Sequence, residues 1–144
     1  MTSLELLAPA KNLSCGIAAV DNGADAVYIG ASQFGARVSA GNSIDDIRQL
    51  CDYAHQYGVK VYATVNTIIY DSELAAVETL IHQLYEAGAD AILVQDMGVL
   101  KMNLPPIALH ASTQTDNRTS QKVRWLQQQG FSRVCWPASF LPAR

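Results

Sequence analysis

The stretch GADAVYIGA, residues 23–31, contains the pattern that decides the fold of this 144-residue chain. It begins with a glycine that follows a helical pattern, and it continues into an apolar run long enough for a buried strand. A glycine that ends a helix by a left-handed turn produces this order of elements. The unit recurs as GVKVYATVNT (58–67), GADAILVQD (88–96) and GFSRVCW (130–136). The repetition predicts strands that alternate with helices.

Two further strands are expected at LELLAP (4–9) and IALHAS (107–112), so that the chain ends after its sixth strand. The strand segments are mostly continuous apolar runs, which are typical of parallel strands covered on both sides. A short helical turn is expected at 97–104. Amphipathic helices are expected at 13–20, 43–57, 72–87 and 118–129.

Strands that alternate with helices indicate an α/β fold with a parallel sheet and right-handed crossovers. Two architectures compete: an open doubly wound sheet and part of a (β/α)8 TIM barrel. A dinucleotide-binding sheet would carry GxGxxG after its first strand, where this chain has APAKN (8–12). The even spacing favours the barrel, and a whole barrel takes about 250 residues. We therefore expect a partial, truncated barrel of about six parallel strands.

The composition supplies enough apolar material for a core: 49% of the residues are hydrophobic, 16% are charged, and the formal net charge is -3. This balance excludes a disordered, low-complexity polypeptide. No run approaches the ~20 apolar residues of a membrane span, and the first residues carry no signal-peptide pattern. We expect no membrane partner and a cytoplasmic location. No block rich in Lys or Arg indicates a broad basic face for nucleic acid.

The three cysteines, Cys15, Cys51 and Cys135, lie far apart in the sequence. Their number and spacing fit neither a disulfide framework nor a CxxC zinc site. Cys15 and Cys51 fall within helical patterns, and we expect both to be small buried apolar side chains.

The working face of a parallel barrel lies at the carboxyl ends of its strands. The most polar of these ends is LHASTQTDN, where His110 and Ser112 are expected on one side of a strand, with Gln114 following. An imidazole, a hydroxyl and an amide at a barrel mouth suit acid–base chemistry or ligand binding. The alternative is a hydrogen-bonded strand end followed by a cap, Asn117 or Thr119, on the next helix.

Asp96 and Asn66 follow two other buried strands. Asp96 is a candidate metal contact, general base or anchor for a substrate hydroxyl, and the alternative is the N-cap of the short helix after it. Asn66 is a candidate substrate contact at the barrel mouth.

Two charged residues are further candidates for the functional site. Glu5 lies inside an apolar strand segment, so its carboxylate must be paired, with Lys60 or Arg37, or face a polar site. The alternative is an edge strand that is exposed to water. Arg37 lies in a long Gly-rich loop, 30–42, where it could meet an anionic group. The alternative for Arg37 is an exposed surface position.

Five segments together carry a resemblance to a known family. LELLAPAKN, NGADAVYIGASQFGAR, YGVKVYATVNT, GADAILVQDMG and IALHASTQTDN resemble the amino-terminal part of the U32 peptidase family, named for collagenase-like proteases. The match covers about residues 4–134. The family-motif segments contain Glu5, Tyr28, Gly30, Asn66, Asp96, His110, Ser112 and Gln114.

The resemblance implies a barrel-type domain and a peptidase activity, with a divalent metal in some members. Other members resemble factors for hydroxylation of a transfer-RNA or ribosomal-RNA base, or for quinone synthesis, that bind an iron–sulfur cluster through cysteines. The cysteine-bearing signature of the family does not occur in this chain. The ending VCWPASFLPAR (134–144) also departs from the family pattern. We interpret 1–134 as a partial barrel and 135–144 as a frameshifted or truncated tail.

Three functional hypotheses follow. The first is a fragment of a U32 peptidase, weak or inactive alone, with His110, Asp96 and Ser112 as catalytic residues. Its substrate-binding residues would be Glu5, Tyr28, Arg37, Asn66 and Gln114, with no metal ligand assigned. The second is the same scaffold in RNA base hydroxylation, and the third is a non-catalytic module that dimerises through open barrel edges. The expected substrate is accordingly a peptide or an RNA-linked group.

Overall fold

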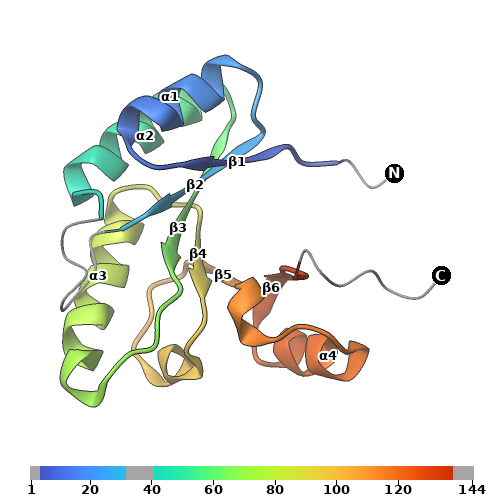
Figure 1. The fold of residues 1–144 in the computed structure, drawn as a ribbon. Helices are drawn as coiled ribbons and strands as arrows, with labels where there is room; N and C mark the ends of the chain where they lie inside the picture. Colours follow the sequence, from blue (N-terminus) through green and yellow to red (C-terminus); the bar gives the residue numbers. More distant parts are fainter. Residues whose placement is uncertain (1–3, 32–40, 138–144) are drawn as a thin grey trace.

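The computed structural model of the protein describes residues 4–31 and 41–137, and Figure 1 shows a curved sheet with helices around it. Six strands form the sheet in their order along the chain, and every neighbouring pair is parallel. They are β1 (Leu7–Ala10), β2 (Ala26–Gly30), β3 (Lys60–Val65), β4 (Ala91–Val94), β5 (Ala108–Ala111) and β6 (Phe131–Val134). The predicted α/β fold with six parallel strands is confirmed.

The α-helices of the described residues occur where the sequence predicts them. The α-helices are α1 (Leu13–Asp21), α2 (Ile44–Gln56), α3 (Leu74–Glu86) and α4 (Ser120–Gln128). The short helices are η2 (Asp71–Glu73), η3 (Met97–Lys101) and η4 (Thr113–Thr115). The turn expected at 97–104 is η3, whereas the short helix η4 was not predicted.

Caps and left-handed glycines set the ends of these helices. The side chain of Thr119 accepts a hydrogen bond from the Lys122 amide at 3.2 Å, which confirms Thr119 as one of the two predicted caps of α4. The glycine of each repeat has a positive φ, for example 91° at Gly23 and 100° at Gly88. Residues other than glycine rarely adopt this backbone conformation, so each repeat needs glycine at that position.

The first strand begins later than predicted. Pairing with β2 starts at Leu7, opposite Ala26, and not at residue 4. The reason is that the amide of Leu6 donates to the carboxylate of Asp25 at 2.7 Å, outside the strand ladder. Glu5 therefore lies in the segment before β1.

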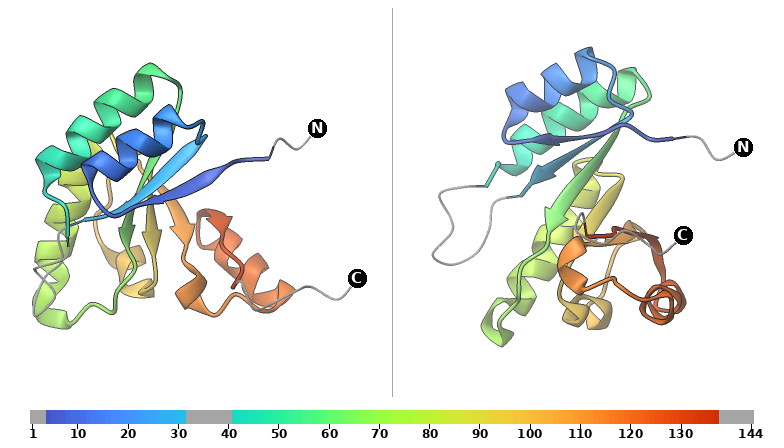
Figure 2. Two further views of the ribbon diagram at one scale, coloured as in Figure 1. Left: turned by 45° about the horizontal axis from the view of Figure 1, so that its top comes forward. Right: turned by 45° about the vertical axis from the view of Figure 1, so that its right-hand side comes forward.

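The two faces of the sheet differ. On the outer face, strand residues such as Val27, Val61 and Ile92 pack with helix residues such as Leu50 and Ile81 into one apolar core. Figure 2 shows the helices on this outer side of the curved sheet. The inner face has a smaller cluster made of strand residues, with Ala26, Tyr62 and Ala91 buried at its centre. Helices thus cover the outer side of the strands, and the inner side is covered by the side chains of the strands themselves, because the sheet curves as a barrel wall does.

The two cysteines that we expected to be buried differ in their solvent exposure. Cys51 is buried, as predicted, whereas Cys15 is exposed and its prediction was wrong. Cys15 lies on α1 two positions after Leu13, and the face of α1 that packs on the core includes Leu13, Ile17 and Val20. A residue two positions along a helix points to the opposite side. Within the described residues, no helix is long and apolar enough to span a bilayer.

Candidate functional site

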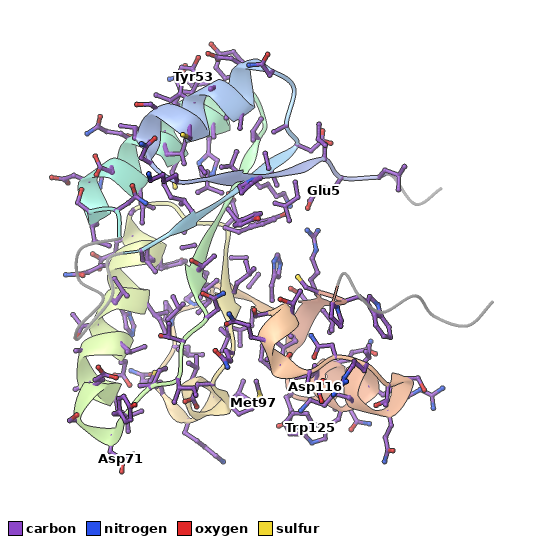
Figure 3. The ribbon with its side chains drawn as sticks, viewed as in Figure 1. Glu5, Tyr53, Asp71, Met97, Asp116 and Trp125 are labelled. Atoms are coloured by element: carbon purple, nitrogen blue, oxygen red, sulfur yellow. The ribbon has the colours of Figure 1, made fainter. Side chains whose placement is uncertain are left out.

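Four polar or charged residues meet on the inner face of the sheet, and we call them the inner-face cluster: Glu5, Tyr62, His110 and Arg133. Tyr62 comes from β3, and His110 and Arg133 lie opposite each other in register on β5 and β6. Glu5 comes from the segment before β1, and Figure 3 shows it on the side of that segment that faces β6. The cluster thus joins the two ends of the sheet.

An ion pair forms the centre of this cluster. The guanidinium of Arg133 donates from Nη1 to Oε1 of Glu5, and from Nη2 to Oε2 at 3.2 Å. The hydroxyl of Tyr62 donates to Oε2 of Glu5 at 2.9 Å and accepts from Arg133 Nη1 at 3.3 Å. Glu5 is therefore paired, although the leucines on either side of it in the sequence are exposed. The predicted partner was wrong in the case of Lys60, since β6 brings Arg133 to the carboxylate instead.

These contacts shift the pKa values of the Glu5 carboxylate and the Tyr62 phenol. The hydrogen bond from Arg133 lowers the pKa of Glu5, and burial opposes this shift. Burial and the hydrogen bond to Glu5 raise the pKa of Tyr62 to about 12. Near neutral pH, Glu5 is thus ionised and Tyr62 keeps its proton as a donor.

His110 is the residue of the cluster with free hydrogen-bonding capacity. Its side chain is 5% exposed and contacts the Tyr62 ring edge-on, with 4.7 Å between ring centroids. Burial first, and then the positive charge of Arg133, lower the pKa of His110 to about 4. Within the described part of the chain, its imidazole makes no hydrogen bond. A neutral imidazole in this state can accept a proton from a ligand, or donate to one, on the inner face.

Asp96 has the alternative role considered for it. Its Oδ1 accepts from the amide of Gly98 at 2.8 Å, as the N-cap of η3. Its Oδ2 accepts from the amide of Ile69 at 3.0 Å, which ties η3 to the loop after β3. Both carboxylate oxygens are thus engaged in holding the backbone.

Ser112 also has the alternative role considered for its segment, since it takes part in a hydrogen-bonded strand end. Its hydroxyl accepts from the amide of Gln114 at 3.3 Å, as the N-cap of η4. The fully buried side chain of Asn117 donates to the carbonyls of Ser112 and Cys135, both at 2.8 Å. Asn117 therefore joins the end of β5 to the end of β6 and does not cap α4.

The structure separates the three candidate catalytic residues. His110 contacts Tyr62, Ser112 bonds within η4, and Asp96 bonds at η3. No hydrogen bond within the described ranges joins any two of them.

The candidate binding residues also occupy different places. Tyr28 lies half-buried in the inner-face apolar cluster, Asn66 is half-buried directly after β3, and Gln114 is exposed on η4. Arg37 lies outside the described residues.

Tyr62 and Arg133 were missed in the sequence analysis, although each places a polar group within a predicted strand. Two positions along a strand bring a side chain back to the same face, so Tyr62 and Thr64 share a face, as do Leu93 and Ala91. The sheet register then extends that face to His110 and Arg133. This periodicity was the available signal, but the register between strands is not written in a single sequence.

The residues described do not fit the iron–sulfur cluster that some members of the resembling family carry. Residues 4–31 and 41–137 contain no group of three His, Cys, Asp or Glu side chains suited to one metal ion. Cys15 is exposed on α1, Cys51 is buried in α2 and Cys135 follows β6. The three thiols belong to separate parts of the fold.

A protein-family model described as "Peptidase family U32" matches residues 11–139, which is most of the chain. The chain belongs to the U32 family. The family resemblance seen in the sequence is thereby confirmed, and so is the barrel-type sheet that it implies.

Two relatives of this U32 chain have names that state a function. The "23S rRNA 5-hydroxycytidine C2501 synthase" of Escherichia coli K12 is 50% identical over 131 residues, which cover 91% of this chain and 20% of that protein. The "tRNA hydroxylation protein P1" of Bacillus subtilis 168 is 34% identical over 134 residues, which cover 90% of this chain and 32% of that protein. The chain thus spans about a fifth to a third of the length of these relatives.

Among solved structures, a U32 peptidase matches the fold of this U32 chain with a TM-score of 0.66 and 12% sequence identity. The match covers 93% of this chain and 60% of that one. At this level of identity the likeness concerns the fold.

Proposed function

We propose that this U32 chain takes part in the hydroxylation of a base in RNA. The observation that carries the proposal is the 50% identity over 131 residues with an enzyme named for making 5-hydroxycytidine in 23S rRNA. The relative named for tRNA hydroxylation supports the same class of substrate. The main sequence hypothesis, peptide hydrolysis, has weaker support than this alternative.

His110 is the residue that we assign to the chemistry. Exchange of a C–H bond of the base for a C–OH bond is a two-electron oxidation, so it requires a co-substrate that supplies the oxygen atom and takes up the two electrons. The proton that leaves the carbon needs an acceptor, and an uncharged imidazole can accept it. The pKa of about 4 keeps the His110 ring uncharged near neutral pH. Its ring nitrogens have no competing partner within the described residues.

Arg133 and Glu5 act as positioning residues for His110. The charge of Arg133 opposes protonation of the imidazole. Glu5 in turn holds the guanidinium in place through two hydrogen bonds. Tyr62 holds the imidazole edge-on by ring contact and bonds to Glu5. Asn66 and Tyr28 stay predicted contacts for the base.

The geometry gives less support to peptide hydrolysis. A hydrolytic nucleophile needs a base within hydrogen-bond reach. The hydroxyl of Ser112 accepts from the Gln114 amide, and both oxygens of Asp96 accept from backbone amides.

The test is removal of the gene that encodes this chain from its source organism. Nucleosides from total ribosomal and transfer RNA are then analysed by mass spectrometry. We expect loss of a nucleoside that is heavier than its parent by one oxygen atom. A plasmid that carries the native gene restores this nucleoside, and His110→Gln does not, because the glutamine amide cannot take up a proton. His82→Gln, on the outer helix α3, is the matched control and restores it.

Two results would contradict the proposal. If no hydroxylated nucleoside disappears on deletion, RNA hydroxylation is not the function. If His110→Gln restores the nucleoside as well as the native gene does, the assignment of His110 is wrong.

A further inference from the structure

The charges of this chain are unevenly distributed along it. The sequence has 13 acidic residues, and all except Asp116 precede residue 97. Residues 97–137 contain Lys101, Arg118, Lys122, Arg124 and Arg133. The part of the molecule built from β5, α4 and β6 is therefore basic, although the chain as a whole is acidic.

Helix α4 presents this charge to the outside. Leu126 is buried and Val123 is half-buried, so these two residues define the side of α4 that packs on the molecule. With a helical period of 3.6 residues, Trp125 lies on the opposite side, between Lys122 and Arg124. Trp125 is 40% exposed. Figure 1 shows α4 beside β6, away from α1, α2 and α3.

An aromatic ring and a cation act together on this face. The ammonium of Lys122 lies 5.2 Å from the centroid of the Trp125 ring. A partly exposed indole beside a cation offers a surface for stacking of a planar group, together with a charge for an anion.

A pocket lies at the start of α4, on the side toward the end of β5. It has a volume of about 530 Å³ and is lined by Asp116, Arg118, Thr119 and Lys122. The carboxylate of Asp116 forms an ion pair with Arg118, which offsets the single negative charge of this region. Figure 3 shows Asp116 and Trp125 on the same part of the molecule.

We infer that Arg118, Lys122, Arg124 and Trp125 form a docking surface for single-stranded RNA, which we call the α4 face. Basic side chains neutralise the phosphates, and a base that is not paired stacks on the indole. Duplex RNA fits less well, because its bases are already stacked on one another. The inference rests on the proposed function, since it names a surface that would hold the RNA substrate.

The spacing explains why no basic block is visible in the sequence. In SQKVRWLQQ, residues 120–128, each basic residue is flanked by an uncharged one. Lys122 and Trp125 are three positions apart and share one side of the helix, whereas Arg124 lies on the other flank of Trp125. The helix contains no acidic residue to oppose these charges. The resulting face is narrow, which agrees with the absence of a broad basic surface.

The experiment measures binding of a fluorescein-labelled, mixed-sequence, single-stranded RNA oligonucleotide to the full chain, by fluorescence anisotropy at several salt concentrations. The variants are Lys122→Gln with Arg124→Gln, and Trp125→Ala. The matched controls are Arg48→Gln and Tyr57→Ala, which remove a cation and an exposed aromatic ring from α2. Circular dichroism verifies that every variant is folded.

We expect the double variant to bind more weakly and to reduce the slope of log affinity against log salt by about 1.4, or about 0.7 for each lost phosphate contact. Trp125→Ala should weaken binding roughly five- to a hundredfold through loss of stacking. The two controls should bind as the native chain does. An RNA duplex of the same length should bind more weakly than the single strand.

The inference is overturned if folded α4 variants bind the RNA as tightly as the native chain. It is also overturned if poly-glutamate of equal charge competes as well as RNA does, because the surface then recognises charge alone. These outcomes are independent of the gene-deletion test: α4 variants that lose RNA binding support the α4 face even where no hydroxylated nucleoside is lost.

Discussion

Arg133 lowers the pKa of two neighbours, with opposite effects on their charge. It favours the ionised form of Glu5 by hydrogen bonding, and it adds to the effect of burial in favouring the neutral form of His110. One guanidinium thereby maintains an anion and an uncharged base on the same face of the sheet. The sequence analysis identified His110 and Glu5 as candidates, but it did not identify the residue that controls both.

The protonation of His110 predicts a pH dependence of stability. Its pKa is about 4 in the folded chain and about 6.5 in an unfolded one, so the unfolded chain binds more protons between these values. The free energy of unfolding should therefore fall as the pH is lowered from about 6.5 to about 4, by up to about 3 kcal/mol. Urea unfolding at several pH values measures this. His110→Gln should flatten the curve, and an equally steep curve for that variant would contradict the assignment.

The Glu5–Arg133 pair predicts a second effect with its own pH window. Glu5→Gln should lower the free energy of unfolding at neutral pH by about 1 kcal/mol, because the pair is partly exposed. The pKa of Glu5 is lowered by folding, so its contribution is present above its unfolded pKa and is lost as the pH falls through the folded one. Urea unfolding of Glu5→Gln, compared with the exposed control Glu86→Gln on α3, measures it. Equal losses in both variants would argue against a specific role for the pair.

At the scale of elements, the helices and strands could be predicted because the repeated glycine and the apolar runs are local signals. Four predicted helices and six predicted strands are present in the described residues. The site could be predicted less well, because Glu5 and Arg133 are 128 residues apart and meet only through the register of the sheet. The roles of Asp96 and Ser112 depended on which backbone amides lie near them, which the sequence does not state.

The contact between α1 and α2 carries a prediction at this scale. A methyl group at Gly16 would lie 2.7 Å from both terminal carbons of Leu50. Gly16→Ala should therefore destabilise the chain by about 1–3 kcal/mol through overpacking, although alanine favours helices more than glycine does.

A double-mutant cycle tests the cause. Gly16→Ala with Leu50→Ala should cost less than the sum of the single changes, because the shortened side chain relieves the clash. Thermal unfolding of the four proteins measures this, and additive losses would show that the two residues do not interact in this way.

At the scale of the whole molecule, the sheet of the described residues has two terminal strands, β1 and β6, each paired on one side only. Open strand edges favour association with other chains. Leu4 and Leu6, just before β1, are 98% and 59% exposed. The dimer stays a prediction, and its expected contact region is this end of the sheet.

We expect the isolated chain to self-associate in sedimentation-velocity experiments. Replacement of Leu4 and Leu6 by lysine should shift it toward the monomer, because charged residues near an edge oppose strand pairing. Leu74→Lys, on α3, is the control and should leave the association unchanged. A native chain that sediments as a monomer at every concentration would exclude the dimer.

The separation of Glu5 and Arg133 along the chain also determines the order in which they are synthesised. Ribosomes release a protein from its amino terminus, so Glu5 emerges 128 residues before its partner Arg133 on β6. During synthesis the carboxylate is hydrated and unpaired, and the neutral environment of His110 does not yet exist. The proton-accepting role proposed for His110 therefore requires that β6 has already joined the sheet.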